Sequence, residues 1–482
     1  MREDPALSFH RAQTRRYELT GLRTGSIRDQ IMRAQMLAQR LISAKELGAN
    51  SHLLVLGGGA CGATLALAAI KQGVHVTLLE KLGNPFSRQM QARSRWLDPS
   101  EYDWPHAHWL IPDMDWKHQG KKPSPYALHY KADSAPNLAA IWATTWASFA
   151  NKGRLKPHLG ELRYFPRTDA SKLTFTPVHR GPDVAAIEVS NWEDPSGPAK
   201  VFDVIVSCIG FVDEHVSVQN DAGQDVHGPK FWHNDDLAEP RLGLTSTATK
   251  PIKVLISGGG DGAQQDLQRV LTGTCAKDLA QRCLQINWAL LNLAELHAID
   301  DSSRRSHIWS DPTQLPLQDL MAWETAYEAA ADQLFHAWTP AQRHALVKQH
   351  FKPDVEVTWL MQEPAMTFGF SLNKLLTWLL LKLHSEHTKR PIRSTRPDTI
   401  TLRGQRIRHV SAVGHDCAKL NGQCADLGHI VETEVAHSVG HQYAHGKLGQ
   451  FDMLVLRHGV KQDTIFGPPP VSEQIIPLYL PS

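Results

Sequence analysis

Cysteines and long apolar runs are both scarce in this chain. Its 482 residues contain six cysteines, and no two of them are spaced as a CxxC pair. A dense disulfide framework of the kind found in small secreted domains is therefore excluded. The most apolar stretch, residues 375–383, contains Lys382 and is far shorter than the ~20 residues of a membrane-spanning helix. We expect a cytoplasmic protein with no membrane partner, in which this stretch is a buried helix.

An excess of charge of either sign is also missing. Lys and Arg together number 51 and Asp and Glu 49, which leaves a net charge of +2. Because no strong positive field would attract nucleic acid, we expect no nucleic-acid partner. The hydrophobic fraction of 42% and the charged fraction of 21% are ordinary for a globular protein. At ~100–200 residues per domain, the length indicates about two to four domains.

Residues 52–80 have the pattern of a strand, a glycine turn, a helix and a second strand. The apolar runs at 53–56 and 74–79 lack clean alternation, as is typical of buried parallel strands. The turn between the first strand and the helix has a GxGxxG sequence, made of Gly57, Gly58, Gly59, Ala60, Cys61 and Gly62. In such a turn the first glycine permits a tight bend, the second lets a pyrophosphate approach the backbone, and the third lets helix and strand pack closely.

An acidic residue follows at the end of the second strand. Seventeen residues separate Gly62 from Glu80. A carboxylate there can accept both hydroxyls of an adenosine ribose and would repel a 2′-phosphate, which disfavours NADP. The phosphates would bind free N–H groups at the helix N-terminus. The pattern therefore predicts an adenine dinucleotide site, and a glycine turn in an unrelated α/β domain is the alternative.

The residues after this acid are further candidates. Lys81 and Arg88 are expected to contact the cofactor, because an arginine can bind pyrophosphate through two parallel hydrogen bonds. The loop that continues to residue 109 is rich in histidine and tryptophan, namely Trp96, Trp104, His106, His108 and Trp109. The histidines are candidates for acid–base chemistry, and a structured surface loop with tryptophan anchors is the alternative. No residue can be assigned as the catalytic acid or base.

A second cycle of the same kind begins near residue 253. An apolar strand at 253–257 leads into three glycines and a helix at 263–271, and a mostly helical insertion over about 276–350 follows. The two cycles close alike, with Phe202-Asp203 and Phe451-Asp452 each preceding an apolar strand and a glycine, Gly210 or Gly459. We predict an N-terminal helical segment (1–50), a dinucleotide-binding domain (51–245), a second Rossmann-like domain (250–460) and a C-terminal tail (461–482).

Residues 52–80 resemble the FAD-binding fingerprint of two-dinucleotide-binding-domain flavoproteins, the broad group that includes thioredoxin reductases. The second turn resembles the NADPH-binding turn of that group, and its candidate residues are Gly258, Gly260, Asp261 and Gly262. With the strand that ends at Gly210, the motifs cover about a third of the chain. The resemblance implies an α/β fold with two Rossmann-like FAD/NAD(P)-binding halves, each with a β-meander. It implies FAD at the first turn, and NAD(P)H is possible at the second.

Three departures keep alternatives open. No arginine pair follows the second turn, no CxxC redox pair is present, and only 23 residues follow Gly459, so NAD remains an alternative at the first site. The preferred interpretation is an FAD-dependent oxidoreductase that acts on an unknown small molecule. The alternatives are a flavin-dependent monooxygenase, or a regulatory or sensor subunit without turnover, with a protein partner or as a homo-oligomer. No metal site is predicted, because no complete ligand signature exists among Cys417, Cys424, His429, His437, His441 and His445.

Overall fold

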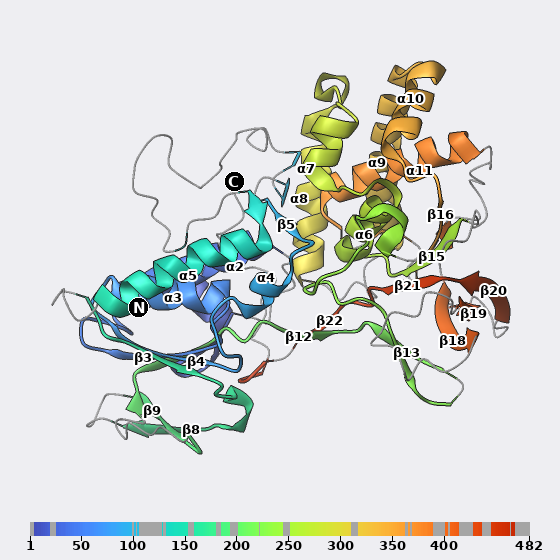
Figure 1. Cartoon of the computed structure of the whole chain (residues 1–482). Helices are drawn as coiled ribbons and strands as arrows, with labels where there is room; N and C mark the ends of the chain where they lie inside the picture. The colour runs from blue at the N-terminus through green and yellow to red at the C-terminus, as the bar shows by residue number, and fades with distance from the viewer. Residues whose placement is uncertain are drawn as a thin grey trace. The chain divides into compact units, whose positions relative to one another are not determined.

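The computed structural model in Figure 1 divides the chain into two compact units. Unit 1 comprises Met1–Pro99, Asp113–Asp213 and Lys461–Ser482, and unit 2 comprises Ser100–Pro112 and Glu214–Val460. The structure describes residues 4–19, 26–98, 101–102, 104–105, 128, 132–152, 159–179, 185–192, 201–220, 222–243, 251–309, 317–361, 365–366, 369–388, 401–402, 405–413, 428–435, 445–462 and 464–467.

Unit 1 is built on a six-stranded sheet. Its strand order is β1 (Arg11–Gln13), β2 (Arg16–Glu18), β11 (Val204–Ser207), β3 (His52–Leu56), β4 (His75–Glu80) and β7 (Leu162–Pro166). All neighbours are parallel except β1 and β2. The helices of the unit are α1 (Pro5–His10), α2 (Ile27–Ser43), α3 (Ala60–Ile70), α4 (Ser87–Gln91) and α5 (Ala135–Lys152). Figure 1 shows α2, α3 and α5 on one face of this sheet.

The opposite face of the sheet is covered by an antiparallel meander. Its strands are β8 (Thr174–His179), β9 (Ala185–Ser190) and β10 (Val201–Phe202), and Figure 1 shows β8 and β9 below β3 and β4. Ile187 and Val189 of β9 pack in one apolar cluster with Leu54 and Ile205 of the sheet. This apolar layer explains why the strands of the sheet are apolar on both faces. A two-stranded ribbon, β5 (Trp96–Leu97) with β6 (Asp133–Ser134), completes the unit.

Unit 2 has a four-stranded parallel sheet. The strand order is β17 (Thr401–Leu402), β16 (Val355–Leu360), β15 (Ile252–Ser257) and β21 (Met453–Leu456). The crossover helices are α6 (Asp261–Thr272) and α11 (Ser371–Thr388), and the second of these contains the apolar run predicted to be a buried helix. A second antiparallel meander is formed by β18 (Gln405–Val413), β19 (Gly428–Val435) and β20 (His445–Phe451).

The predicted helical insertion lies between α6 and β16. It contains α7 (Ala276–Asp278), a π-helical turn (Leu279–Cys283), a 3₁₀ turn (Trp288–Leu290), α8 (Leu293–Trp309), α9 (Leu317–Ala337) and α10 (Pro340–His350). Unit 2 also contains the small ribbon β13 (Ser217–Gln219) and β14 (Asp225–His227). The chain passes from unit 1 to unit 2 through β12 (Phe211–Glu214) and returns through β22 (Val460–Gln462).

The two units repeat one topology. The order β17-β16-β15-β21 in unit 2 matches β7-β4-β3-β11 in unit 1, and in each unit a three-stranded meander precedes the closing strand. The repeated aspartate has the same contact in both. The Asp203 carboxylate accepts the N–H of His52 at 2.7 Å, and the Asp452 carboxylate accepts that of Lys253 at 2.8 Å. The predicted α/β fold with two Rossmann-like halves is therefore confirmed.

The structure differs from the sequence analysis in several strands. The pattern over 399–413 suggests a hairpin, but β17 pairs with β16 in the parallel sheet and β18 pairs with β19 in the meander. The alternating short β-runs over 155–201 are typical of a meander, but Leu162–Pro166 joins the parallel sheet instead. In the segment 1–50, two short strands accompany the helices, and Ile465 at the other end of the chain donates its N–H to Glu18. Short strands look alike in sequence, so periodicity does not reveal their partners.

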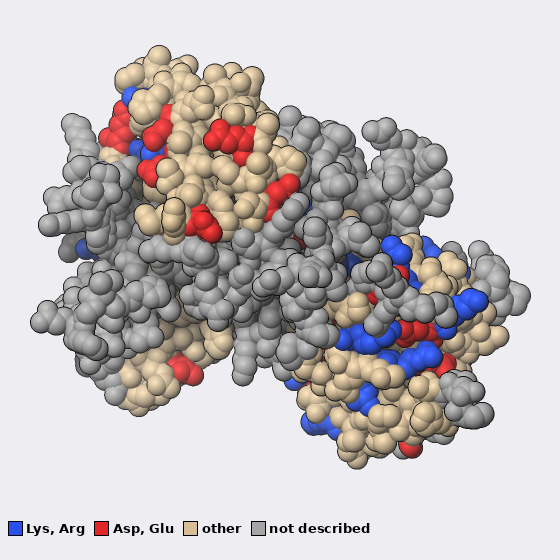
Figure 2. Space-filling view, turned by 180° about the vertical axis from the view of Figure 1, so that it is seen from behind, with Lys and Arg blue, Asp and Glu red and all other residues tan. Residues whose placement is uncertain are grey.

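The surface and the helix lengths add two further observations. On the face shown in Figure 2, acidic and basic side chains are interspersed among uncharged surface and lie next to one another in places, and neither sign covers the described part of that face. Among the described helices, none is long and apolar enough to cross a membrane.

The bend at Gly57 should be intolerant of any side chain. Its φ is +102°, and a Cβ would lie 2.4 Å from the carbonyl oxygen of Cys208 on the neighbouring strand. We predict that Gly57→Ala destabilises unit 1 by about 2–5 kcal/mol, from the strained φ and the overpacking. Hydrogen exchange at the amides of β3 and β11 measures this loss. Gly48→Ala is the matched control, because its Cβ meets nothing within 4 Å, and equal protection in the two variants would contradict the prediction.

Candidate functional site

The first glycine turn joins β3 to α3 and leaves one side open. Gly57 donates its N–H to the carbonyl of Leu79 at 2.8 Å, which ties the turn to the adjacent strand. Gly59 is the N-cap residue of α3, and a Cβ at this position would meet nothing within 4 Å. No side chain among the described residues caps this helix end. The N–H groups of the first turn of α3 are thus available to an anion, as in phosphate-binding helix termini.

The third glycine of the turn provides close packing. A Cβ on Gly62 would lie 1.9 Å from the carbonyl oxygen of Gly57 and 3.2 Å from the side chain of Val55. Only glycine therefore lets α3 begin directly above β3. The three glycines of the motif have the roles that the sequence analysis gives them: bend, open approach and close packing.

Glu80 lies at the carboxyl end of β4 and reaches back to the turn. Its carboxylate accepts the N–H of Gly58 at 2.5 Å and that of Leu82 at 2.7 Å. These two bonds orient the carboxylate beside the glycine turn, where an acid reads the ribose of a dinucleotide. Tyr164 of β7 is nearby, and its pKa lies well above the ordinary value because of burial and the charge of Glu80. Its phenol therefore stays neutral at physiological pH.

The two basic candidates occupy different surroundings. Lys81 is largely exposed, and its amine forms an ion pair with Asp169 at 3.1 Å. The pKa of Asp169 is lowered by hydrogen bonds from Ser171 and by this amine. Arg88 lies on α4, and the residue before that helix, Phe86, donates its N–H to the carbonyl of Gly58 at 3.3 Å. Helix α4 therefore begins beside the glycine turn, whereas Lys81 is paired with a carboxylate.

The two buried cysteines of unit 1 lie in the same region. Cys61 is in the first turn of α3, and Cys208 follows the closing strand β11. Burial and the neighbouring Cys61 raise the pKa of the Cys208 thiol well above its ordinary value. A protonated, buried thiol is a poor nucleophile, so Cys208 acts here as a packing residue. Gly210 comes next, with a φ of +75° and open space at its Cβ position.

The aromatic loop after Arg88 divides into structural and undescribed residues. Trp104 is fully buried in the core of unit 2, which matches the anchor interpretation, while Trp96 is half exposed. His106 and His108, which the sequence analysis singles out for acid–base chemistry, lie outside the described residues, as does Trp109. No catalytic acid or base is identified in the described part of unit 1.

The second glycine turn has the same backbone but different surroundings. Gly258 has a φ of +133°, and its Cβ would lie 2.1 Å from the carbonyl oxygen of Arg457; Gly260 is the N-cap residue of α6. The position equivalent to Glu80, after the next strand, is held by Met361, which is completely buried. A buried thioether cannot accept ribose hydroxyls as a carboxylate does.

The Asp261 carboxylate at the start of α6 is already hydrogen-bonded, mainly to residues at the start of helix α11. Its carboxylate accepts the N–H of Phe370 at 2.9 Å, the Asn373 amide at 2.8 Å and the Gln265 amide at 2.7 Å. Burial raises the pKa of Asp261 to about 6 despite these three bonds. On the other side of the turn, a Cβ on Gly262 would meet the ring of Phe231 at 3.3 Å. A resident carboxylate thus occupies the start of α6.

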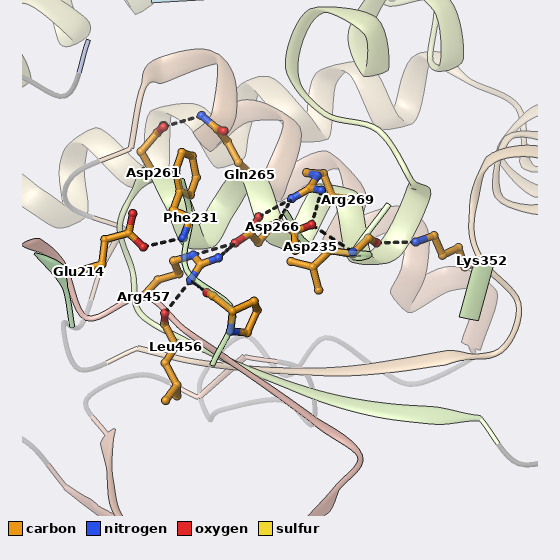
Figure 3. A network of polar contacts seen from close by, with 12 residues as sticks. Glu214, Phe231, Asp235, Asp261, Gln265, Asp266, Arg269, Lys352, Leu456 and Arg457 are labelled. Carbon is orange, nitrogen blue, oxygen red and sulfur yellow. Dashed lines mark hydrogen bonds and ion pairs between the residues drawn. The ribbon is translucent and has the colours of Figure 1, made fainter. Parts of the chain in front are cut away.

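An ionic network behind the second turn explains the arginine that follows β21 (Figure 3). The Arg457 guanidinium donates to Asp266 at 2.8 Å, and Asp266 also accepts from Arg269 at 3.1 Å. Arg269 is in turn paired with Asp235 at 2.5 Å. Asp266 is fully buried, so this network locks the closing strand to α6. The sequence analysis missed it, because its four members come from three separate segments of the chain.

The residues of the first turn fit an adenine dinucleotide, and those described at the second do not. The first turn combines an open glycine, an uncapped helix end and an oriented carboxylate. The second combines a buried methionine at the ribose position with an aspartate already bonded to α11. The cofactor role predicted for Gly258, Gly260, Asp261 and Gly262 therefore lacks the side chains that would complete it within the described residues.

Metal ligation finds no support in the part of the chain that the structure describes. There, no group of three or more His, Cys, Asp or Glu side chains could hold an ion. Most of the histidine- and cysteine-rich stretch considered in the sequence analysis, including Cys417, Cys424, His437 and His441, lies outside the described residues.

Comparisons with known proteins give structural likeness only. No family description and no curated protein matches the chain. Among solved structures, a T. acidophilum thioredoxin reductase is 10% identical with a TM-score of 0.32, over 86% of this chain and 78% of that one. A bacillithiol disulfide reductase from Staphylococcus aureus is 10% identical with a TM-score of 0.34, over 86% and 77%. A Lactococcus lactis thioredoxin reductase is 9% identical with a TM-score of 0.33, over 85% and 78%. At such identities no particular relative is singled out.

The carboxyl group of Asp261 should make the stability of unit 2 depend on pH. Its pKa is about 6 in the folded state, against 3.8 for an ordinary aspartate. As pH rises from about 4 to 6 the unfolded chain loses this proton first, so the folded state is progressively destabilised. The variant Asp261→Asn keeps an acceptor oxygen for α11 but has no proton to lose. We predict that its free energy of unfolding rises by about 2 kcal/mol relative to that of the parent protein between about pH 4 and pH 6. Urea denaturation at several pH values measures the difference, and a difference that does not change with pH would rule out the assignment.

Proposed function

We propose that unit 1 binds an adenine dinucleotide, that this cofactor is FAD, and that the protein is an FAD-dependent oxidoreductase. The observation that carries the proposal is the Glu80 carboxylate, bonded to Gly58 in the glycine turn and beside the uncapped end of α3. An acid in this place binds the ribose while the helix end binds the pyrophosphate. Neither the Glu80 carboxylate nor the uncapped end of α3 is needed for the packing of the sheet, because Gly57 and Gly62 already provide the tight bend and the close helix packing.

The choice of FAD over NAD rests on the resemblance of residues 52–80 to the FAD-binding fingerprint. The meander β8, β9 and β10 before β11 fits such a domain, but unit 2 has a meander in the same place, so the meander does not separate the two cofactors. Glu80 disfavours a 2′-phosphate, and Lys81 is paired with Asp169 rather than left to bind one. NADP is therefore the least suitable dinucleotide for this site.

The residues of unit 1 would hold and orient the cofactor. Glu80 would accept the ribose hydroxyls, the N–H groups after Gly59 would bind the pyrophosphate, and Arg88 on the adjacent α4 would add a cation beside it. A bound flavin supplies hydride transfer to or from a small-molecule substrate. The protein contributes binding and orientation, and the substrate is unassigned.

A regulatory subunit that binds the dinucleotide without turnover is the second candidate. The specific observation in its favour is Met361, since a second nucleotide in unit 2 would find no ribose acceptor at this position. A chain with one dinucleotide site and no substrate that exchanges hydride with the flavin would sense the cofactor rather than turn it over. Flavin absorption together with substrate-dependent bleaching separates the two candidates.

The ligand released from the purified protein tests the proposal directly. We expect the protein to be yellow and to release FAD on denaturation, identified by mass. Gly59→Val should purify without it, because the valine side chain would stand where the pyrophosphate approaches the backbone. Gly59 has a φ of −69° and open space around its Cβ position, so the variant should fold. Full FAD occupancy in the valine variant would place the site elsewhere.

The carboxylate of Glu80 should contribute to affinity in a graded way. We predict that Glu80→Ala weakens FAD binding by roughly 10- to 150-fold, since hydrogen bonds to a charged group contribute ~1.5–3 kcal/mol. Glu80→Gln should be weakened less, because its amide oxygen still accepts from Gly58 or the ribose. Titration of the apoprotein with FAD, followed by quenching of flavin fluorescence, gives the dissociation constants. Unchanged affinity in the alanine variant would refute the role of Glu80.

The residues around the second glycine turn allow a prediction of whether reduced nicotinamides can reduce the flavin. With Met361 at the ribose position and Asp261 bonded to α11, we expect neither NADPH nor NADH to reduce the bound flavin rapidly. Anaerobic stopped-flow mixing measures the decay of the flavin band. Fast bleaching that Gly260→Val abolishes would instead establish a working nicotinamide site in unit 2.

A further inference from the structure

Unit 2 contains a buried lysine without a conventional partner. Lys374 lies in the first turn of α11, and only 3% of it is exposed. The structure gives its amine neither a hydrogen bond nor an ion pair within the described residues. The contact it does make is with the ring of Tyr327, whose centre is 5.5 Å from the amine nitrogen.

Carboxylates surround this amine, but each is bonded to other donors. Asp300 of α8 accepts from Ser371 and, at 2.6 Å, from Arg304. Glu324 of α9 accepts the N–H of Met366 at 3.2 Å. Asp261 accepts from the start of α11, as described above. The charges of these three acids favour the protonated form of Lys374 from a distance. None of the three forms a hydrogen bond or an ion pair with its amine in the described part of the chain.

Two partly buried lysines in the unit, Lys382 and Lys352, are held in the usual way. Lys382, two turns later on α11, pairs with Asp332 at 2.7 Å and with Glu328 at 3.4 Å. Lys352 donates to the carbonyl of Leu237 at 2.7 Å. Lys374 lacks such a bond and also stands at a helix N-terminus, where the helix dipole disfavours a cation. A structural role for its charge is thus poorly supported, and a chemical role for its amine is favoured.

The protonation of this amine suits a chemical role. Burial lowers the pKa of Lys374 to about 8, and the nearby acids only partly oppose this shift. Roughly a tenth of the molecules then carry a neutral amine at pH 7, far more than for an ordinary lysine. Neutral, desolvated lysines act as nucleophiles toward carbonyl compounds.

The position of Lys374 also suits a ligand site. Helix α11 follows β16, and Asp261 opens α6 after β15, so both helix starts lie at the carboxyl ends of the parallel strands. Open α/β sheets bind their ligands at this edge. An anionic ligand is disfavoured, because the cluster already contains three carboxylates against Lys374 and Arg304. We propose that Lys374 is a reactive amine that condenses with the carbonyl group of a small, uncharged aldehyde or ketone.

The reaction needs no oxidant or reductant. The neutral amine nitrogen forms a bond to the carbonyl carbon, and one amine proton passes to the carbonyl oxygen to give a hydroxyl group. The C–O bond then breaks, and the hydroxyl leaves with the second amine proton as one water molecule, which leaves an imine. A hydrogen-bonded chain lies next to the amine: the Tyr327 hydroxyl is 2.5 Å from that of Ser371, which donates to Asp300. Burial and the charge of Asp300 raise the pKa of Tyr327 far above its ordinary value, so its phenol stays neutral beside the amine and serves as a hydrogen-bonding group rather than as an acid.

Limited reductive alkylation of the folded full chain tests the proposal. The probe is propanal with cyanoborohydride at pH 7, stopped at low modification, and the sites are read by peptide mass spectrometry. We expect Lys374 to be modified at least tenfold faster than Lys382, with a rate that rises with pH to a plateau above about pH 8. Lys352, whose pKa is also lowered to about 8 but which is hydrogen-bonded, is the matched control and should react several-fold more slowly than Lys374.

A charge variant separates a reactive amine from a merely accessible one. Glu324→Gln keeps an acceptor for Met366 but removes a charge that favours the ammonium form, so the pH profile of Lys374 should move to lower pH. Modification of Lys374 no faster than that of Lys382, or equal to that of Lys352, would overturn the proposal. Because the comparison between lysines is made on the parent protein, it decides the question even if the variant fails to fold.

Discussion

The fold of both units depends on one close approach between backbone atoms. After the first strand of each sheet, the chain turns so near to the closing strand that no Cβ fits: the distance to the carbonyl oxygen would be 2.4 Å at Gly57 and 2.1 Å at Gly258. This approach fixes where the first helix begins and which strand lies beside the turn. The repeated aspartate at the other end of the closing strand holds the same pair of strands in register. Turn, helix start and strand order therefore follow together from a constraint that only glycine satisfies.

Around this shared backbone the two units have diverged in charge. The first places Leu65 and Ala68 on its helix α3, both buried, whereas the corresponding positions of α6 are Asp266 and Arg269. Burying such an ionic network costs desolvation energy that an apolar pair avoids, and its contribution to stability is small or negative unless every member is satisfied. What the network does secure is the position of Arg457 and of the closing strand. The glycine turn of unit 2 is therefore packed against side chains of the same unit, whereas the glycine turn of unit 1 is open on one side.

The sequence predicts most of the fold and the first site, for identifiable reasons. The glycine turn, Glu80 and the buried strands are local signals, and they place α3 and β4 within a few residues of the structure. The partners of short strands could not be predicted, since β17 and β18 adjoin in sequence yet join different sheets. The cluster around Lys374 was also invisible, because its members come from four separate helices and one loop. Tertiary proximity of that kind leaves no periodic trace in a single sequence.

Unit 1 is assembled from three stretches of chain, and the last of them, from Lys461 on, follows unit 2 in the sequence. Glu18 is completely buried in β2 and accepts the N–H of Ile465, and Phe466 packs on Phe175 within the same apolar cluster. On the ribosome, the N-terminal strands must wait through the synthesis of nearly all of unit 2 before these contacts become available. The inserted unit can reach its own fold first. Unit 1, which carries the open glycine turn, is thus completed only after unit 2 has been synthesised. Loss of a few residues near 465 would therefore expose the buried carboxylate of Glu18, far away in the sequence.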